Sequence, residues 1–151
     1  MKKKKIIVFF AVFLIIVIGV IFLIFSNRKN ERTNDEYISI LLENKEDFEC
    51  VAQVMQQWSE GSIDFNNGIS SANQQIENEI TNNDDFKTSL LNLYDLKEIS
   101  YILIEGDTIA FYFSKFPADY HGGVFYGKNI EENFGTYTID EDWVLKMIPN
   151  V

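Results

Sequence analysis

The sequence is poor in the residues that build disulfides and metal sites, since its 151 residues include one cysteine and one histidine. The lone Cys50 excludes an internal disulfide framework, and one cysteine with one histidine cannot supply the ligands of an ordinary zinc site. A P-loop and the G-x-G-x-x-G, H-E-x-x-H and G-x-S-x-G motifs are also absent. These absences remove common signatures of nucleotide binding, zinc proteolysis and serine hydrolysis. We expect no catalytic residue, cofactor or metal.

Charged residues are missing from residues 6–25, a run of twenty residues that are apolar apart from Gly19. A helix rises about 1.5 Å per residue, so this run spans roughly the 30 Å hydrocarbon core of a bilayer. A cleaved signal peptide is the competing interpretation. The run is longer than the usual apolar region of such a peptide, and no small-x-small cleavage site follows it. We therefore predict an uncleaved transmembrane anchor at residues 6–25.

Four lysines precede this run, and three basic residues follow it within the next seven positions. The excess of lysine before the span predicts that residues 1–5 form a basic cytoplasmic tail. Residues 26–35 contain no apolar residue and are expected to be a polar spacer, with residues 36–151 forming an extracytoplasmic domain. The predicted location is therefore the cell membrane, with a single pass and a cytoplasmic amino terminus.

The part of the chain after residue 25 is strongly acidic. It holds all 23 acidic residues against nine basic ones, a net charge of about −14. Such a charge repels nucleic acid and anionic lipid headgroups, because affinity for phosphates comes mostly from lysine and arginine. A partner attracted by long-range charge is therefore a basic protein or peptide. The alternative is a solvated acidic surface that serves solubility.

Apolar residues recur at spacings of three and four over three stretches that follow the spacer. Glu36–Trp58 is predicted to form one helix or two, and Ile69–Ile80 and Phe86–Tyr94 are each predicted to form one more. After Asp95 the period of the apolar residues changes to two. This change predicts that helices come first and that a sheet follows.

A hairpin is predicted where Glu98–Ile104 and Thr108–Phe113 flank Gly106-Asp107, because glycine readily supplies the positive φ of a two-residue turn. A slip of one residue would exchange the two faces of the strands. The predicted register pairs Ile104 with Ile109, Ile102 with Phe111 and Ser100 with Phe113 on one face, and Leu103 with Ala110, Tyr101 with Tyr112 and Ile99 with Ser114 on the other.

Other strands are predicted at Ser62–Phe65, Val124–Tyr126, Tyr137–Ile139 and Trp143–Ile148, with a loop at Phe116–Gly123. Helices followed by an antiparallel meander indicate an α+β fold. We thus expect an N-terminal transmembrane helix, followed by a small domain of two or three helices packed on a four- to five-stranded antiparallel sheet.

Aromatic side chains gather in the predicted sheet, and a domain this small cannot bury all of them. Tyr and Trp are favoured at protein interfaces because they bury a large area at low entropic cost. We therefore predict an aromatic sheet face that binds a protein or peptide. The alternative is that helices and loop segments cover both faces. The predicted binding residues are Tyr101, Tyr112, Tyr120, His121, Tyr126 and Trp143.

The single histidine, His121, precedes Gly122 and Gly123, which allow a close backbone approach. One interpretation is a general base that Asp119 orients, and the other is a histidine that packs at a tight strand entry. The acidic turn Asp140–Asp142, with two further glutamates at residues 131 and 132, is compatible with a divalent cation, a basic peptide or a solvated turn.

These patterns favour a non-catalytic, membrane-anchored interaction module that binds a protein or peptide at the cell surface. A second hypothesis is a small-ligand-binding α+β domain with an apolar pocket beneath Ile102 and Phe111. A third is an enzyme that uses His121.

Overall fold

The computed structural model describes residues 16–18, 32–116, 119–128, 130 and 135–150. From Arg32 onward the chain forms one compact unit. The predicted tail at residues 1–5, and most of the predicted anchor and spacer, lie outside the described residues. Within the anchor only residues 16–18 are described, and they are helical. Among the described residues, no helix has the length and apolar character to cross a bilayer.

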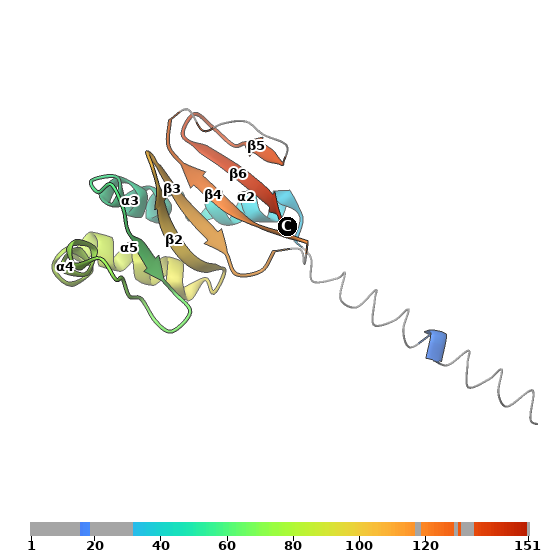
Figure 1. Ribbon diagram of the computed structural model, residues 1–151, viewed down its shortest axis with the longest axis horizontal. Coiled ribbons are helices and arrows are strands. Elements are labelled where there is room, and N and C mark those ends of the chain that lie inside the picture. The colour runs from blue at the N-terminus through green and yellow to red at the C-terminus, as the bar shows by residue number, and fades with distance from the viewer. Residues whose placement is uncertain (1–15, 19–31, 117–118, 129, 131–134, 151) are drawn as a thin grey trace, which may run out of the picture. The chain divides into compact units, whose positions relative to one another are not determined.

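The compact unit has the predicted α+β fold, with helices on one face of an antiparallel sheet (Figure 1). The predicted numbers are wrong, because the described residues of this unit form four helices and six strands. The strand order is β1-β2-β3-β4-β6-β5, so β6 lies between β4 and β5. The elements are α2 (Asn34–Glu43), α3 (Lys45–Met55), β1 (Ser62–Asp64), α4 (Gln74–Asn82), α5 (Asp84–Asp95), β2 (Ile99–Glu105), β3 (Thr108–Phe113), β4 (Tyr120–Tyr126), β5 (Thr136–Thr138) and β6 (Trp143–Pro149).

The first helix of the unit begins at Asn34, inside the predicted spacer. Thr33 and Glu36 form a capping box, in which the Thr33 side chain accepts from the Glu36 N–H and the Glu36 carboxylate accepts from the Thr33 N–H. Asn44 then separates α2 from α3, since its φ of −124° and ψ of 26° leave the helical range. The stretch predicted as one helix or two is therefore two helices.

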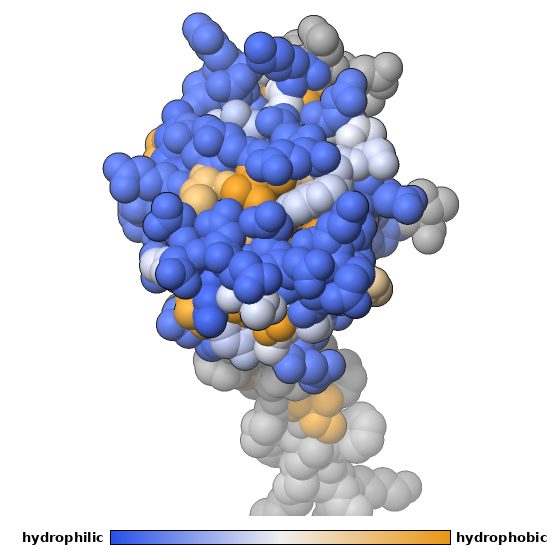
Figure 2. Space-filling view, turned by 90° about the vertical axis from the view of Figure 1, so that its left-hand side faces the viewer, coloured by the Kyte–Doolittle hydropathy of each residue, from blue (hydrophilic) through white to orange (hydrophobic). Residues whose placement is uncertain are grey.

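The core lies between the helices and one face of the sheet. Phe48 of α3 packs against Phe111 of β3 with ring centroids 4.9 Å apart, and its ring meets that of Trp143 of β6 edge to face at 5.9 Å. All three side chains are fully buried. In Figure 1, α2 lies behind β4 and β6. Figure 2 shows that the outer side of the unit, where α3, α4 and α5 lie, is largely hydrophilic, with only small apolar areas.

The predicted register of the β2–β3 hairpin is confirmed from Tyr101 to Ile104 and fails at Ser100. A bulge at Ser100 places Ile99, rather than Ser100, opposite Phe113. The physical reason is burial, because the extra residue brings Ile99 to the core face beside Phe113, where the two side chains are 5% and 6% exposed. The Ser100 hydroxyl instead donates to the carbonyl of Tyr112 at 3.1 Å.

The predicted loop at Phe116–Gly123 is wrong in its second half, because β4 already begins at Tyr120. A Cβ at Gly122 would lie 2.0 Å from the carbonyl oxygen of Lys146, and a Cβ at Gly123 would lie 1.9 Å from that of Phe111. The close approach that the two glycines permit is therefore to the neighbouring strands, β6 and β3.

The outer edge of β1 is occupied by the chain that follows it. The Asp64 N–H donates to the Ser70 carbonyl at 2.8 Å, and the Ser70 N–H donates back to the Asp64 carbonyl at 3.2 Å. The Ser71 hydroxyl donates to the Ser62 carbonyl at 2.6 Å. This edge of the sheet is closed by its own loop.

We expect Gly123→Ala to lower the free energy of unfolding by about 2 kcal/mol or more, because the added methyl group forces β3 and β4 apart. Chemical denaturation of the full-length protein measures this change. His121→Ala is the control on the same strand, since His121 is exposed and its loss costs within about 0.5 kcal/mol. Equal stability of the Gly123→Ala variant and the wild type would contradict the close approach.

Candidate functional site

Strand alternation divides the six predicted binding residues between the two faces of the sheet. The face opposite the core, here called the helix-free face, has no helix of the described chain packed on it. Tyr101, Tyr112 and His121 lie on this face. Four buried strand residues form a small apolar layer on this face: Ala110, Tyr112, Phe125 and Val144. The partly buried side chains of Tyr101, Leu103, Ile148 and the loop residue Ile130 pack against this layer.

The centre of the helix-free face is a pair of stacked tyrosines. The rings of Tyr101 and Tyr112 lie 4.4 Å apart and 17° from parallel, and Phe125 meets Tyr112 edge to face at 5.7 Å. The Tyr112 hydroxyl donates to the carboxylate of Glu105. Tyr112 is 8% exposed, whereas Tyr101 is half-buried. The Tyr101 ring is therefore the accessible one, and it stacks on the buried Tyr112 ring.

Burial, first, and the neighbouring Glu105 carboxylate, second, raise the pKa of both tyrosines above the ordinary value. Both phenols are therefore neutral at physiological pH, and that of Tyr112 donates to Glu105. On the same face, toward β6, the Lys146 ammonium lies 5.1 Å from the centre of the Phe125 ring. The helix-free face thus carries an acidic group beside the tyrosines and a basic group beside the phenylalanine.

His121 lies at the margin of the helix-free face. Its Nδ1 atom is 2.8 Å from the amide oxygen of Asn150, and its ring centroid is 6.5 Å from that of Tyr112. The predicted orienting residue, Asp119, contributes its backbone carbonyl to the Asn150 N–H at 2.8 Å. The histidine is thus held by an amide, and not by the Asp119 carboxylate that the general-base interpretation expected.

The other three predicted binding residues belong to the helix-packed face. Tyr120 and Tyr126 are half-buried. The expectation that Trp143 is a surface residue is wrong, because it shares the parity of buried Leu145 and packs against Tyr126 with centroids 4.9 Å apart. Its Nε1 atom is buried and has no hydrogen-bond partner among the described residues. Trp143 therefore belongs to the core.

The acidic turn at Asp140–Asp142 is held by its first carboxylate. Asp140 accepts hydrogen bonds from the N–H groups of Asp142 and Trp143, both at 3.0 Å, and from the Lys45 ammonium at 2.7 Å. Burial alone would raise the pKa of Asp140, but these hydrogen bonds outweigh it and lower the pKa below its ordinary value. The same bond to Asp140 raises the pKa of Lys45. The Asp140 carboxylate therefore stabilises the acidic turn and its contact with Lys45.

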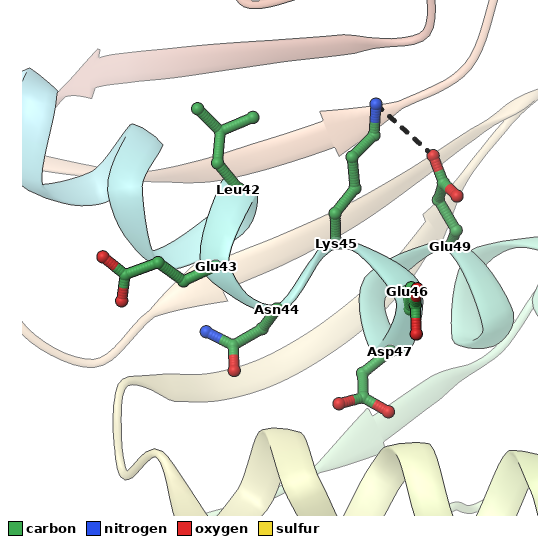
Figure 3. A pocket seen from close by; sticks show the side chains of 7 residues that line it. All are labelled: Leu42, Glu43, Asn44, Lys45, Glu46, Asp47 and Glu49. Carbon is green, nitrogen blue, oxygen red and sulfur yellow. Dashed lines mark ion pairs between the residues drawn. The ribbon is translucent and has the colours of Figure 1, made fainter.

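The cation interpretation of these carboxylates finds no support in the described chain. The glutamates at residues 131 and 132 lie outside the described residues, and the described ones form no group of three side chains that could hold a metal ion. The surface depression between α2 and α3 is also acidic, with a volume of about 580 Å³. Figure 3 shows that its side chains diverge, since Lys45 reaches toward Glu49 while Glu43 and Asp47 point away. These side chains do not point toward a common position at which a ligand could bind.

Sequence reasoning missed a groove at the end of the sheet where the β2–β3 hairpin turns. Two adjoining depressions with volumes of about 390 and 340 Å³ share Gln56 and Asp107. Their lining comes from the end of α3, the hairpin tip, the end of β4 and the acidic turn. No sequence motif predicts this groove, because four separate segments of the chain contribute to it.

We expect Trp143→Ala to lower the free energy of unfolding by about 3–5 kcal/mol, the usual cost of emptying a core site of this size. Trp143→Phe costs less, because it retains a ring and removes a buried N–H that lacks an acceptor. Urea denaturation of both variants measures the difference. A Trp143→Ala variant as stable as the wild type would contradict the core assignment.

We expect Asp140→Asn to lower the melting temperature near neutral pH, because the amide still accepts the backbone N–H groups but does not attract Lys45. A carboxyl whose pKa is depressed by folding stabilises the protein above its unfolded pKa of about 3.9, and this contribution is lost as the pH falls through the folded pKa. The difference from the wild type should therefore shrink as the pH falls below about 3.9.

Glu141→Gln is the control for this pH series, because Glu141 is an exposed neighbour in the same turn. Thermal melts from about pH 2 to pH 7 distinguish the two variants. A loss in Asp140→Asn that persists undiminished at low pH would show that charge is not the cause.

Comparison of the chain with protein-family models, with curated proteins and with solved structures finds no match. Its function is therefore argued from the sites themselves, since a fold class alone does not specify an activity. Two surfaces of the described chain that bring aromatic and charged side chains together are the helix-free face and the groove at the hairpin end.

Proposed function

We propose that this protein is a non-catalytic interaction module that binds a basic protein or peptide through the helix-free face of its sheet. In this proposal residues 6–25 anchor the chain in the cell membrane with a cytoplasmic amino terminus. The compact unit then stands outside the cytoplasm, at the cell surface. The apolar run and the lysines before it support the anchor and its orientation.

The observation that carries the binding role is the stacked pair of Tyr101 and Tyr112 on a sheet face that no described helix covers. Interfaces draw most of their energy from a few aromatic anchors held in place by a packed surround. Tyr112 is fixed by its bond to Glu105 and its contact with Phe125, so Tyr101 presents a ring that is already ordered before binding. Ordering in advance reduces the entropic cost of association.

Charge supports a basic partner. The chain after residue 25 has 23 acidic and nine basic residues, a net charge of about −14 that steers cations toward it. On the helix-free face two carboxylates lie near the half-buried ring of Tyr101, because Asp64 is opposite Tyr101 in the β1–β2 register and Glu105 accepts the hydrogen bond of its stacked neighbour. A lysine or arginine beside an apolar anchor residue complements this arrangement.

Surface binding fits the packing better than the alternative of an enclosed ligand pocket beneath Ile102 and Phe111. Both side chains are fully buried, and the ring of Phe48 lies against that of Phe111. The space where the pocket was expected is therefore filled by core side chains. His121, held by Asn150, gives no support to a general-base mechanism.

The test is cross-linked affinity capture of the full-length, membrane-inserted protein from its own cells, with mass spectrometry of the product. We expect Tyr101→Ala to reduce recovery of one basic partner by roughly tenfold, the effect of losing about 1.4 kcal/mol at an interface anchor. Tyr137→Ala is the matched control, since Tyr137 is a 43% exposed tyrosine that pairs with Leu145 and so belongs to the other face. Recovery that is equal in all three proteins would contradict the helix-free face as the binding surface.

A further inference from the structure

The groove at the β2–β3 turn, here called the hairpin-end groove, is a second concave surface, separate from the helix-free face. Each of its two depressions, of about 390 and 340 Å³, exceeds the share of one liquid water, about 30 Å³, more than tenfold. Either part is therefore large enough for a side chain of a partner. The lining of the groove includes Gln56, Trp58, Asp107, Tyr126, Lys128 and Asp142.

Two half-buried aromatic rings lie in this groove at positions fixed by the fold. Trp58 follows α3, where its backbone N–H donates to the Met55 carbonyl at 3.2 Å and its side chain packs against the core. Tyr126 packs its ring on the buried Trp143, with the ring centroids 4.9 Å apart. Rings held in this way offer faces on which a cation can lie, at little entropic cost.

Two carboxylates come from opposite sides of the groove. Asp107 belongs to the hairpin tip, and Asp142 ends the acidic turn. Gly127 lies between their backbones, because its N–H donates to the Asp142 carbonyl at 3.0 Å and a Cβ on it would lie 3.0 Å from the Asp107 carbonyl. Unlike Asp140, neither carboxylate has an ion pair or a side-chain hydrogen bond within the described chain. Lys128 is the basic residue beside them.

We infer that the hairpin-end groove binds an arginine or lysine side chain from an extended basic segment of a partner protein. A guanidinium group suits the site best, since its plane can stack on Trp58 or Tyr126 while its N–H groups donate to Asp107 or Asp142. The acidic surplus of the domain attracts such a segment, and the unpaired carboxylates give it a place to bind. This binding does not depend on the helix-free face.

The probe is a fluorescent hexa-arginine peptide, titrated into the full-length protein in neutral detergent and followed by anisotropy. We expect the combined Asp107→Asn and Asp142→Asn substitutions to weaken its affinity by roughly tenfold, since they remove both acceptor charges of the groove. The matched control is the pair Glu43→Gln and Glu46→Gln, which removes two exposed charges at the α2–α3 junction. This control should change the affinity by less than about twofold, the effect of distant screened charge.

The aromatic contribution is tested separately. Trp58→Ala should weaken the binding of hexa-arginine, and Trp58→Phe should restore most of it, because a phenyl ring still offers a face to the cation. The single Asp107→Asn variant, in an exposed turn, serves if the double variant melts below the wild type.

Three results would overturn the inference: no binding of hexa-arginine at low salt, an equal loss in the groove and control double variants, or no effect of Trp58→Ala. An equal loss would mean non-specific charge attraction only. The helix-free face is tested by capture of the cellular partner with Tyr101→Ala, and the groove is tested by hexa-arginine with the Asp107→Asn, Asp142→Asn and Trp58→Ala variants, so a failure of either proposal is seen in a different experiment.

Discussion

The arrangement of the compact unit depends on one contact, that of the Phe48 ring with the rings of Phe111 and Trp143. These fully buried rings fix the position of α3 over the centre of the sheet. Because α3 is rigid, its first residue, Lys45, then reaches Asp140 on the acidic turn, while Trp58, just beyond its end, reaches the groove beside the β2–β3 turn. Local helix propensity contributes little to this placement, since short helices owe most of their stability to tertiary packing.

The β2–β3 hairpin shows how much of a strand register can be predicted from the alternation of apolar residues. The turn at Gly106 and the alternating apolar residues were sufficient to predict the pairing of Tyr101 with Tyr112, although not that the two rings stack. The pattern could not show the bulge at Ser100, because a bulge inserts one residue without changing the composition of either strand. A start for α2 was also readable, since Thr33-Asn34-Asp35-Glu36 has the spacing of a capping box.

The candidate site could be predicted only in part, and the reason is non-local pairing. Composition placed an aromatic cluster in the sheet, but only the pairing of β4 with β6 shows that Trp143 faces the helices. Tyr126 lies opposite Trp143 and takes the same face, although Phe125 beside it takes the other. The hairpin-end groove is further from prediction still, because residues between positions 56 and 142 meet there without any shared spacing.

The loop that follows β1 has a consequence for how other chains can associate with this protein. An exposed strand edge invites strand addition and, at worst, fibril growth, because its main-chain groups lack partners. On β1 the Asp64 N–H and carbonyl are already bonded to Ser70, and the Ser62 carbonyl accepts from the Ser71 hydroxyl. A neighbouring polypeptide would have to break these bonds before it could extend the sheet there. These bonds oppose fibrillar assembly at this edge of the sheet. A partner that approaches from this side is therefore expected to contact side chains rather than to form an intermolecular β-sheet.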